Sequence, residues 1–585
     1  MSNENTGWHK RRAVIIAVAS IAFVAKLLLA LKTYGTNDVY TYERFGLWSR
    51  YFGAELYRIA PDLNHPPSVL HFMSSILWIS EHTRLPFHFW LRFPGILADA
   101  GSLWLVCRIL RARLAERSVF VAVLFIAIAP IHIMISGFHG NTDPVMIFFV
   151  MLAVWLAGDC ENAAAGGAAY GMALCIKIAP VILIPVLFLS LPGMRKRIAF
   201  FAAAAAVVVV TWSPYIFDDP SAVIHQVFGY KSSYGLWGFS WIFRQLANVS
   251  PAFGWINSEY SRFGSILVMG AILALSIVMS RLPKKPSLYT QVGMIYLLFF
   301  SITSGFGVQY LAWLTPWVAE LGALPVGLFV VTGSVFLLVV YNYWTLGMPW
   351  YLAIAYPWSS HQYFQVLCWL SVVLLTLAAW SRIRHDREFG LLRYIEKLSP
   401  SLRWSAAGIG FAVLLFYPAF VHMRHDRLSV SPSYAEDEAL YTEADATQNL
   451  ATELARHGRR AEADAVQHHA EILTAQAQTI TNELAKTQPL RYTLWTPENY
   501  VDASLDDYNG GDFTQCIHDA TESLKTRPSM PAAWNNISLC NAELGNWDAA
   551  LAAATEALRI EPESDVVREN LEWIAGEKRK QASGR

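Results

Sequence analysis

Long apolar runs recur along most of this chain and constrain its fold more than any other feature. They begin at Ala13 and continue to about Val421, and many approach the roughly 20 residues that a helix needs to cross a membrane. The sequence is 54% hydrophobic and 15% charged, which is more apolar and less charged than a typical soluble protein. These runs predict an all-α, polytopic membrane helical bundle over residues 1–421.

We expect about 13 membrane spans in this bundle. The stretch 66–80 is about fifteen residues long and begins with two prolines, so we favour a half-buried or re-entrant helix there over a crossing. Several other candidates are also short, so some neighbouring pairs are expected to be broken helices. The candidate spans are 13–31, 87–107, 118–135, 143–158, 163–178, 180–192, 198–214, 261–280, 287–303, 306–320, 322–343, 361–380 and 402–421.

Basic clusters set the expected orientation. The first apolar run follows the segment from His9 to Arg12, which resembles the start of a signal peptide, but the run is long and we interpret it as a retained first helix. If 66–80 does not cross, four later clusters fall on the same side as the N-terminus, which is then cytoplasmic. The clusters are at 108–117, 195–197, 281–285 and 382–393. Thirteen crossings place the C-terminus outside.

The remainder of the chain has a different composition. Residues 422–585 carry 15 basic and 27 acidic residues, whereas residues 1–421 carry 30 and 18, so a basic membrane part is joined to an acidic soluble part. We expect 422–490 to be a helical linker, rich in Ala, Glu and Gln, with one degenerate repeat unit. The six cysteines of the whole chain show no metal spacing, and we do not expect a disulfide between Cys516 and Cys540, the two in the soluble part.

An internal repeat fills residues 491–585. Two segments align at a period of 34, with aromatic, small and proline residues at matching positions. The period and residue types resemble tetratricopeptide repeats, which present a concave face to a protein or peptide. We therefore expect a protein partner or acceptor for this part. The matched pairs are Tyr500 and Trp534, Gly511 and Gly545, Phe513 and Trp547, Ala520 and Ala554, Leu524 and Leu558, and Pro528 and Pro562.

Polar residues gather in the loops expected on the outer face, at Lys32–Leu85, around 137–144 and at Tyr215–Tyr260. Asp38 begins an aromatic-rich segment there, and an acid beside a bilayer is costly unless it is solvated or paired. It could also simply cap a surface helix. Other polar residues of the same expected face are candidates for substrate binding. They are Asn37, Arg44, His65, His139, Asn141, Asp143, Lys177, Lys231, Arg244 and Gln309.

Taken together, these segments resemble the GT-C superfamily of integral-membrane glycosyltransferases, in particular bacterial mannosyltransferase-like members. The matching segments are Asp38, "NHPP", "GNTDP", "KIAP" and "QYLAWLTP", within residues 34–317. Two positions depart from the family pattern: His65 replaces a tyrosine, and Asn141 stands near the usual glutamine. The departures bear on the identity of sugar and acceptor.

The resemblance implies transfer of a hexose, mannose-like, from a polyprenyl-phosphate sugar to an acceptor hydroxyl at the outer face of a bacterial inner membrane. Asp38 would be the general base, and Lys177, Lys231 and Arg244 would stabilise the leaving phosphate. We assign no cofactor, and nucleic acid is not an expected partner. A divalent cation at Asp38, Asp143 or His139 stays open.

Two other classes of function compete with this hypothesis. A lipid or solute transporter or flippase would have charged residues at the membrane midplane and repeats within the membrane part. We find no such repeat, and the polar residues gather at one face. A membrane-anchored repeat scaffold for envelope assembly would not need so many spans.

Overall fold

The computed structural model describes residues 2–60, 63–229, 232–247, 250–345, 350–353, 363–385, 432–456, 458–487, 497–562 and 564–582. They form two compact units, one up to residue 480 and one beyond it. Nearly every element is a helix, because apolar runs in a membrane must satisfy their backbone groups within the segment.

The first half of unit 1 is given by the following elements: α1 (Ser2–Lys32), β1 (Gly35–Thr36), α2 (Asp38–Phe52), η1 (Gly53–Glu55), α3 (Leu56–Ile59), α4 (Pro67–His82), α5 (Phe87–Leu110), α6 (Glu116–Ala127), α7 (Pro130–Met134), η2 (Ile135–His139), α8 (Asp143–Val154), η3 (Trp155–Asp159), α9 (Ala163–Ile176), η4 (Ala179–Leu183), α10 (Ile184–Ser190) and α11 (Gly193–Asp218).

Its second half contains α12 (Pro220–Gly229), α13 (Gly238–Ala247), α14 (Pro251–Ser280), α15 (Leu288–Ile302), η5 (Val308–Tyr310), α16 (Leu311–Val318), η6 (Ala319–Leu321), α17 (Ala323–Trp344), β2 (Leu352–Ala353), α18 (Tyr363–His385), α21 (Pro432–Arg456) and α22 (Arg460–Thr487). The elements η2 and η3 are π-helical turns, and the other η elements are 3-10 turns.

Seven helices among the described residues are long and apolar enough to cross a membrane, which agrees with the predicted all-α membrane bundle. They are Trp8–Lys32, Phe87–Leu110, Glu116–His139, Gly193–Asp218, Ala252–Ser280, Ala323–Trp344 and Phe364–Arg384. Three further expected spans correspond to shorter apolar helices, Ala163–Ile176, Ala179–Ser190 and Leu288–Ile302. The expected span 402–421 lies outside the described residues, and α4 is not one of the seven.

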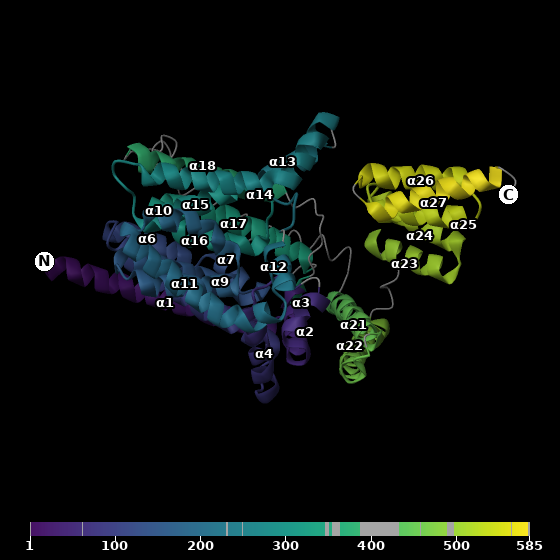
Figure 1. The fold of residues 1–585 in the computed structure, drawn as a ribbon, viewed down its shortest axis with the longest axis horizontal. Coiled ribbons are helices and arrows are strands. Elements are labelled where there is room, and N and C mark those ends of the chain that lie inside the picture. Colours follow the sequence, from purple (N-terminus) through teal and green to yellow (C-terminus); the bar gives the residue numbers. More distant parts are fainter. Residues whose placement is uncertain are drawn as a thin grey trace. The chain divides into compact units, whose positions relative to one another are not determined.

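Small residues allow the bundle helices to approach closely. Figure 1 shows α9 and α11 running alongside each other. A Cβ at Gly167 would clash with the backbone of Phe200, and one at Gly171 would lie 2.7 Å from the carbonyl oxygen of Ala204. Glycines four residues apart are the usual means of such close packing in membranes.

The helical hairpin α21–α22 packs against α2 within unit 1, although we expected this region to be part of a linker. Glu443 of α21 pairs with Arg44 of α2 at 3.0 Å. Leu450 and Leu454 join the buried apolar cluster that contains Trp48. The hairpin therefore extends the membrane unit, and it supports the helix that begins with Asp38.

Unit 2 consists of α23 (Pro497–Gly510), α24 (Phe513–Thr526), α25 (Pro531–Glu543), α26 (Trp547–Ile560) and α27 (Asp565–Ala582). Alternate helices begin 34 residues apart, at Pro497, Pro531 and Asp565, so the sequence period appears as repeated helix pairs. Gly511 and Gly545 occupy the same turn in the two pairs with φ of 82° and 77°, a conformation that favours glycine.

Cys516 of α24 and Cys540 of α25 form a disulfide, with Cα atoms 6.5 Å apart. Our expectation of two free thiols was wrong. The two cysteines are 24 residues apart in sequence, but packing of α24 on α25 brings them together.

Candidate active site

Asp38 is the first residue of α2, and the strand before it fixes its position. β1 pairs in parallel with β2. Gly35 in β1 has φ of 113°, and a Cβ there would lie 2.7 Å from the carbonyl oxygen of Phe138. Thr36 Oγ1 donates a hydrogen bond of 2.8 Å to the carbonyl oxygen of His139. The segment that carries Asp38 is therefore held directly against η2, which carries His139.

A buried arginine ties these two segments together. Arg92 of α5 is 1% exposed. Its guanidinium donates to Thr33 Oγ1 and to the carbonyl oxygens of Thr33, Tyr34, Gly137 and Phe138, over 2.5–3.1 Å. The irregular backbone around η2 and β1 leaves carbonyls without helical partners, and a buried carbonyl needs a donor. Arg92 supplies the donors and so fixes the relative position of Asp38 and His139.

Two side chains hold one oxygen of the Asp38 carboxylate. His139 Nε2 lies 3.4 Å from Asp38 Oδ2, and Asn141 Nδ2 donates to the same oxygen at 3.1 Å. The Asp38 side chain is 40% exposed. No hydrogen bond among the described residues involves Oδ1, which is thus the oxygen available to a ligand.

Tyr341 of α17 determines how His139 meets Asp38. Its hydroxyl lies 2.6 Å from His139 Nδ1. If Nδ1 carried the proton, the Nε2 lone pair would face an ionised carboxylate, which is repulsive. The favourable arrangement has the Tyr341 hydroxyl donating to Nδ1 and a proton on Nε2 directed at Asp38. His139 therefore presents a donor to the carboxylate.

The amide of Asn141 is oriented in a similar way. Its Oδ1 accepts hydrogen bonds from the Thr142 backbone N–H at 2.6 Å and from the Tyr42 hydroxyl at 3.3 Å. Burial raises the pKa of Tyr42, so this hydroxyl keeps its proton. With Oδ1 accepting, Nδ2 must face Asp38 as a donor.

A second carboxylate has a different environment. Asp143 is fully buried, and both of its oxygens accept from Lys177 Nζ, at 2.9 and 2.8 Å. Trp313 Nε1 donates to the same carboxylate at 2.5 Å. The Lys177 ammonium also lies 5.1 Å from the ring centre of Tyr310. Asp143 is therefore the counter-charge that holds Lys177 in place.

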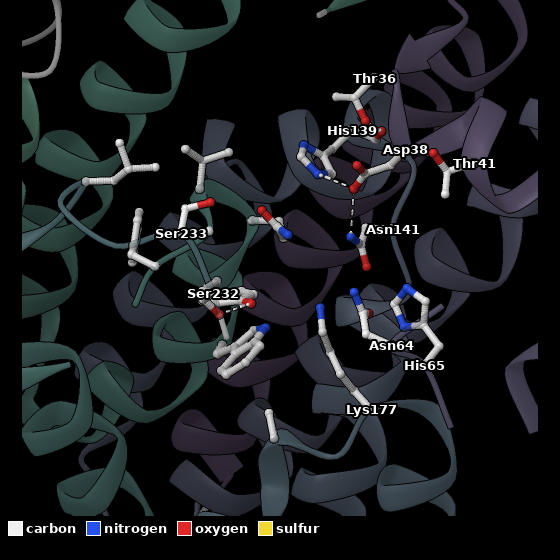
Figure 2. Close-up of a pocket in the computed structure, with 18 of the residues that line it drawn as sticks. Thr36, Asp38, Thr41, Asn64, His65, His139, Asn141, Lys177, Ser232 and Ser233 are labelled. Atoms are coloured by element: carbon white, nitrogen blue, oxygen red, sulfur yellow. Dashed lines mark hydrogen bonds and ion pairs between the residues drawn. The ribbon is translucent and has the colours of Figure 1, made fainter. Parts of the chain in front are cut away.

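These groups surround a cavity of about 720 Å³. Figure 2 shows Asp38, His139 and Asn141 pointing toward one another, with Lys177 nearby and Ser232 on the opposite wall. Much of the remaining lining is aromatic or aliphatic, at Phe299, Phe306, Phe336, Val340 and Trp344. The cavity is therefore lined by both polar and apolar side chains.

The electrostatic environment keeps the Asp38 carboxyl ionised. Burial raises the pKa of Asp38, but the hydrogen bond from His139, together with Lys177 and Asn141, lowers it below its ordinary value. Burial, with the charge of Lys177, lowers the pKa of His65 to about 3. His65 is therefore a neutral imidazole at physiological pH, beside a carboxylate that can accept a proton.

The structure brings most of the predicted site residues together. The residues that line the cavity are Asn37, Asp38, His65, His139, Asn141, Lys177, Arg244 and Gln309. Asp143 lies directly behind Lys177. Arg44 instead pairs with Glu443, and its guanidinium lies 5.1 Å from the ring centre of Trp48. Lys231 lies outside the described residues.

Two residues of the site were missed. Tyr42 stands four residues after Asp38, on the same face of α2, and this spacing was a usable signal. Tyr341 gives no such signal, because a tyrosine near the end of an apolar helix is common at membrane interfaces.

The donor set does not form a metal centre by itself. No group of three His, Cys, Asp or Glu side chains suited to a metal ion occurs in the part of the chain that the structure describes. Asp143 is already neutralised by Lys177, which leaves Asp38 and His139 as a pair. The chemistry below uses no metal.

No protein-family model matches the sequence, and no curated protein matches it.

Proposed function

We propose that this protein is an integral-membrane glycosyltransferase that moves a hexose from a polyprenyl-phosphate donor to an acceptor hydroxyl. The observation that carries the proposal is an ionised carboxylate with one free oxygen, on the wall of a cavity that is otherwise lined by both polar and apolar side chains. A lipid-linked sugar likewise combines a polar head with an apolar chain.

In the reaction, the acceptor hydroxyl lies at Oδ1 of Asp38. Its oxygen attacks the anomeric carbon while the bond from that carbon to the phosphate oxygen breaks, and the phosphate leaves with the electron pair. The hydroxyl proton passes to Asp38, which acts as general base. A phosphate is a weakly basic leaving group, so it departs without a second acid.

Charge develops on the departing phosphate, and cations on the cavity wall stabilise it. Lys177 and Arg244 both line the cavity. Because Asp143 already binds Lys177 through both oxygens, Lys177 acts as an oriented donor with a reduced net charge. Arg244 is a second cation on the wall, and its fork geometry suits phosphate oxygens. Phe306, Phe336 and Trp344 offer surfaces for the sugar or the first prenyl units.

The test is transfer of labelled sugar from a synthetic polyprenyl-phosphate donor by the purified protein in lipid nanodiscs. Asp38→Asn keeps the shape of the side chain but cannot accept the proton, so turnover should fall about 100- to 10,000-fold. Glu81→Gln alters an acid of α4 that pairs with Arg50 and does not line the cavity, and it should leave turnover unchanged. Near-normal turnover by Asp38→Asn would refute the assigned base.

A transporter is the second candidate, because an ion pair joins Lys26 and Asp99 inside two apolar spans. The same nanodisc preparation distinguishes the two functions. A transferase forms a new glycoside, whereas a transporter moves labelled lipid or solute between compartments with its covalent structure intact.

We further propose about 13 crossings in the inner membrane of a bacterium, with the N-terminus in the cytoplasm. The repeated helix pairs of unit 2 are proposed to be tetratricopeptide repeats that recruit a protein acceptor or partner on the outer side. Truncation after Thr487 should then preserve transfer to a small soluble acceptor and abolish transfer to extracted envelope protein. Equal loss of both activities in a folded protein would contradict recruitment.

A further inference from the structure

A second polar site lies inside the helical bundle, away from the Asp38 cavity. Asp99 of α5 receives Lys26 Nζ of α1 at 2.7 Å and Ser136 Oγ at 2.5 Å. The Nδ1 atom of His132 in α7 lies 3.2 Å from the other carboxylate oxygen. Each of these residues lies in one of the helices long enough to cross a membrane. An ionisable cluster in that environment is a marker of function or of internal water.

Beside the cluster is a cavity of about 100 Å³, lined by Lys26, Asp99, Ser102 and His132 together with apolar side chains. Two atoms on this lining have no hydrogen-bond partner among the described protein atoms, Ser102 Oγ and His132 Nε2. Ser102 is 4% exposed and His132 is 6% exposed. A buried polar atom without a partner is rare in proteins, and here two of them share one cavity.

The chemistry of the lining decides what the cavity can bind. A metal cation is disfavoured, because Asp99 is the only acid on the lining and Lys26 already neutralises it. An anion is disfavoured because Asp99 already neutralises Lys26, the positive charge on the lining. A hydrocarbon chain would leave both orphan atoms without a partner. The remaining class is a small neutral molecule that both donates and accepts hydrogen bonds.

We propose that this cavity binds a cluster of ordered water molecules. A water needs space and two to four polar partners, and the volume accommodates about three at roughly 30 Å³ each. In this arrangement one water between Ser102 and His132 bonds both unpartnered atoms, Ser102 Oγ and His132 Nε2. The other waters bond Lys26 and Asp99. The site is a hydrated ionic joint between α1, α5 and α7.

The joint lies close along the chain to the candidate active site. Ser136, which donates to Asp99, is in η2, and three residues later the same π-helical turn ends at His139. A π-turn inside a helix leaves backbone and side chains in unusual positions, and such turns often occur at functional sites. The hydrated cluster holds η2 at Ser136, and His139 at the other end of the same turn contacts Asp38.

Hydroxyl-radical footprinting by synchrotron radiolysis tests the proposal in the full-length protein in nanodiscs, because radicals form at bound water and modify the adjacent side chains. Phe23 lines the cavity, whereas Phe125 is a similarly half-buried phenylalanine in another apolar span that does not line it. Phe23 should be modified several-fold faster than Phe125. Equal rates would overturn the proposal and indicate a dry or lipid-filled cavity.

A paired variant removes the polar atoms that hold the water. Ser102→Ala with His132→Leu should reduce modification of Phe23 to the rate of Phe125, and an unchanged rate would contradict the assignment to this cluster. Ser102→Ala alone is the milder substitution for use if the double variant fails to fold. It removes one partner and should lower the Phe23 rate partially, with the Phe125 rate unaffected.

Discussion

Asp38 and Asp143 show how two carboxylates in one site acquire different roles. The Asp38 side chain is 40% exposed and receives its two donors on a single oxygen. Asp143 is fully buried, and both of its carboxylate oxygens accept hydrogen bonds from Lys177 or Trp313. Of these two carboxylates, Asp38 alone has an oxygen open to the cavity, so in the proposed reaction the environment, rather than the residue type, separates the base from the counter-charge.

Replacing Tyr341 by Phe tests the proposed orientation of His139. Without the hydroxyl donor at Nδ1, His139 can adopt the tautomer that turns a lone pair toward Asp38. The pKa of Asp38 should then rise, and the acid limb of the pH–rate profile should move to higher pH. Losing one hydrogen bond to a charged network, roughly 1.5 kcal/mol, corresponds to about a tenfold lower turnover.

Tyr343→Phe is the matched control, two residues along α17 and not on the cavity lining. It should leave both the turnover and the profile unchanged. A profile for Tyr341→Phe that superimposes on the wild type would mean that Tyr341 has no influence on Asp38.

The pairing of Lys177 with Asp143 makes a prediction about stability. Lys177→Met leaves a fully buried carboxylate without its cation, so the free energy of unfolding should fall by about 3–5 kcal/mol. Lys196→Met breaks an ion pair whose carboxylate, on Glu161, is 77% exposed, and should change the free energy of unfolding far less. Thermal unfolding of both variants measures the contrast, and similar losses would argue against a buried pair.

Part of this site was accessible from sequence. Asp38, His139 and Lys177 were recognisable because charged or polar residues at the ends of apolar runs are costly and therefore informative. Their partners were not. That Asp143, 34 residues earlier, holds Lys177 was not predicted. Which polar residues meet depends on packing between distant helices, and a single sequence does not encode that in a local pattern.

Among the helices, length decided what could be predicted. The long spans were recognisable because twenty apolar residues have few alternatives to a crossing helix. Shorter segments gave poorer boundaries, since Pro130 and the π-turn η2 divide one apolar run into several elements. The hairpin α21–α22 was misplaced as linker because its few buried positions, such as Leu450, lie in an otherwise polar composition.

Contact between α2 and the hairpin should depend on pH. Glu43 of α2 accepts a hydrogen bond from Tyr34, and burial, with the charges of Glu443 and Glu81, raises its pKa to about 7. The folded protein thus holds a proton that the unfolded chain releases from about pH 4.5 upward. Stability should fall as pH rises from about 4.5 to 7 and remain lower above that range.

Glu43→Gln removes this charge and keeps an acceptor for Tyr34. The variant should gain thermal stability relative to the wild type at pH 8 and little at pH 5. Glu161→Gln, at a side chain that is 77% exposed and does not act on the pKa of Glu43, provides the control and should show no comparable gain. If the thermal stability of Glu43→Gln and of the wild type changed in parallel between pH 5 and pH 8, Glu43 would not hold the proposed proton in the folded protein.

At the scale of the whole molecule, the disulfide of unit 2 bears on topology. Disulfides persist in oxidising compartments and are rare in the cytoplasm. The bond between Cys516 and Cys540 therefore agrees with a C-terminal part outside the inner membrane, which is also what 13 crossings require. Cys160, by contrast, is an exposed free thiol that follows the fourth expected span, and the proposed orientation puts it on the cytoplasmic side.

These three cysteines provide a topology test within one chain. In intact cells with a permeabilised outer envelope, a membrane-impermeant maleimide should label none of them, because Cys516 and Cys540 are bonded and Cys160 is inside. An impermeant reductant should then expose Cys516 and Cys540 to labelling while Cys160 stays protected. After lysis, Cys160 should be labelled without any reductant. Labelling of Cys160 in intact cells, with unit 2 protected, would contradict this orientation. It would mean that α4 crosses the membrane, and the side of the membrane assigned to the Asp38 site would have to be revised.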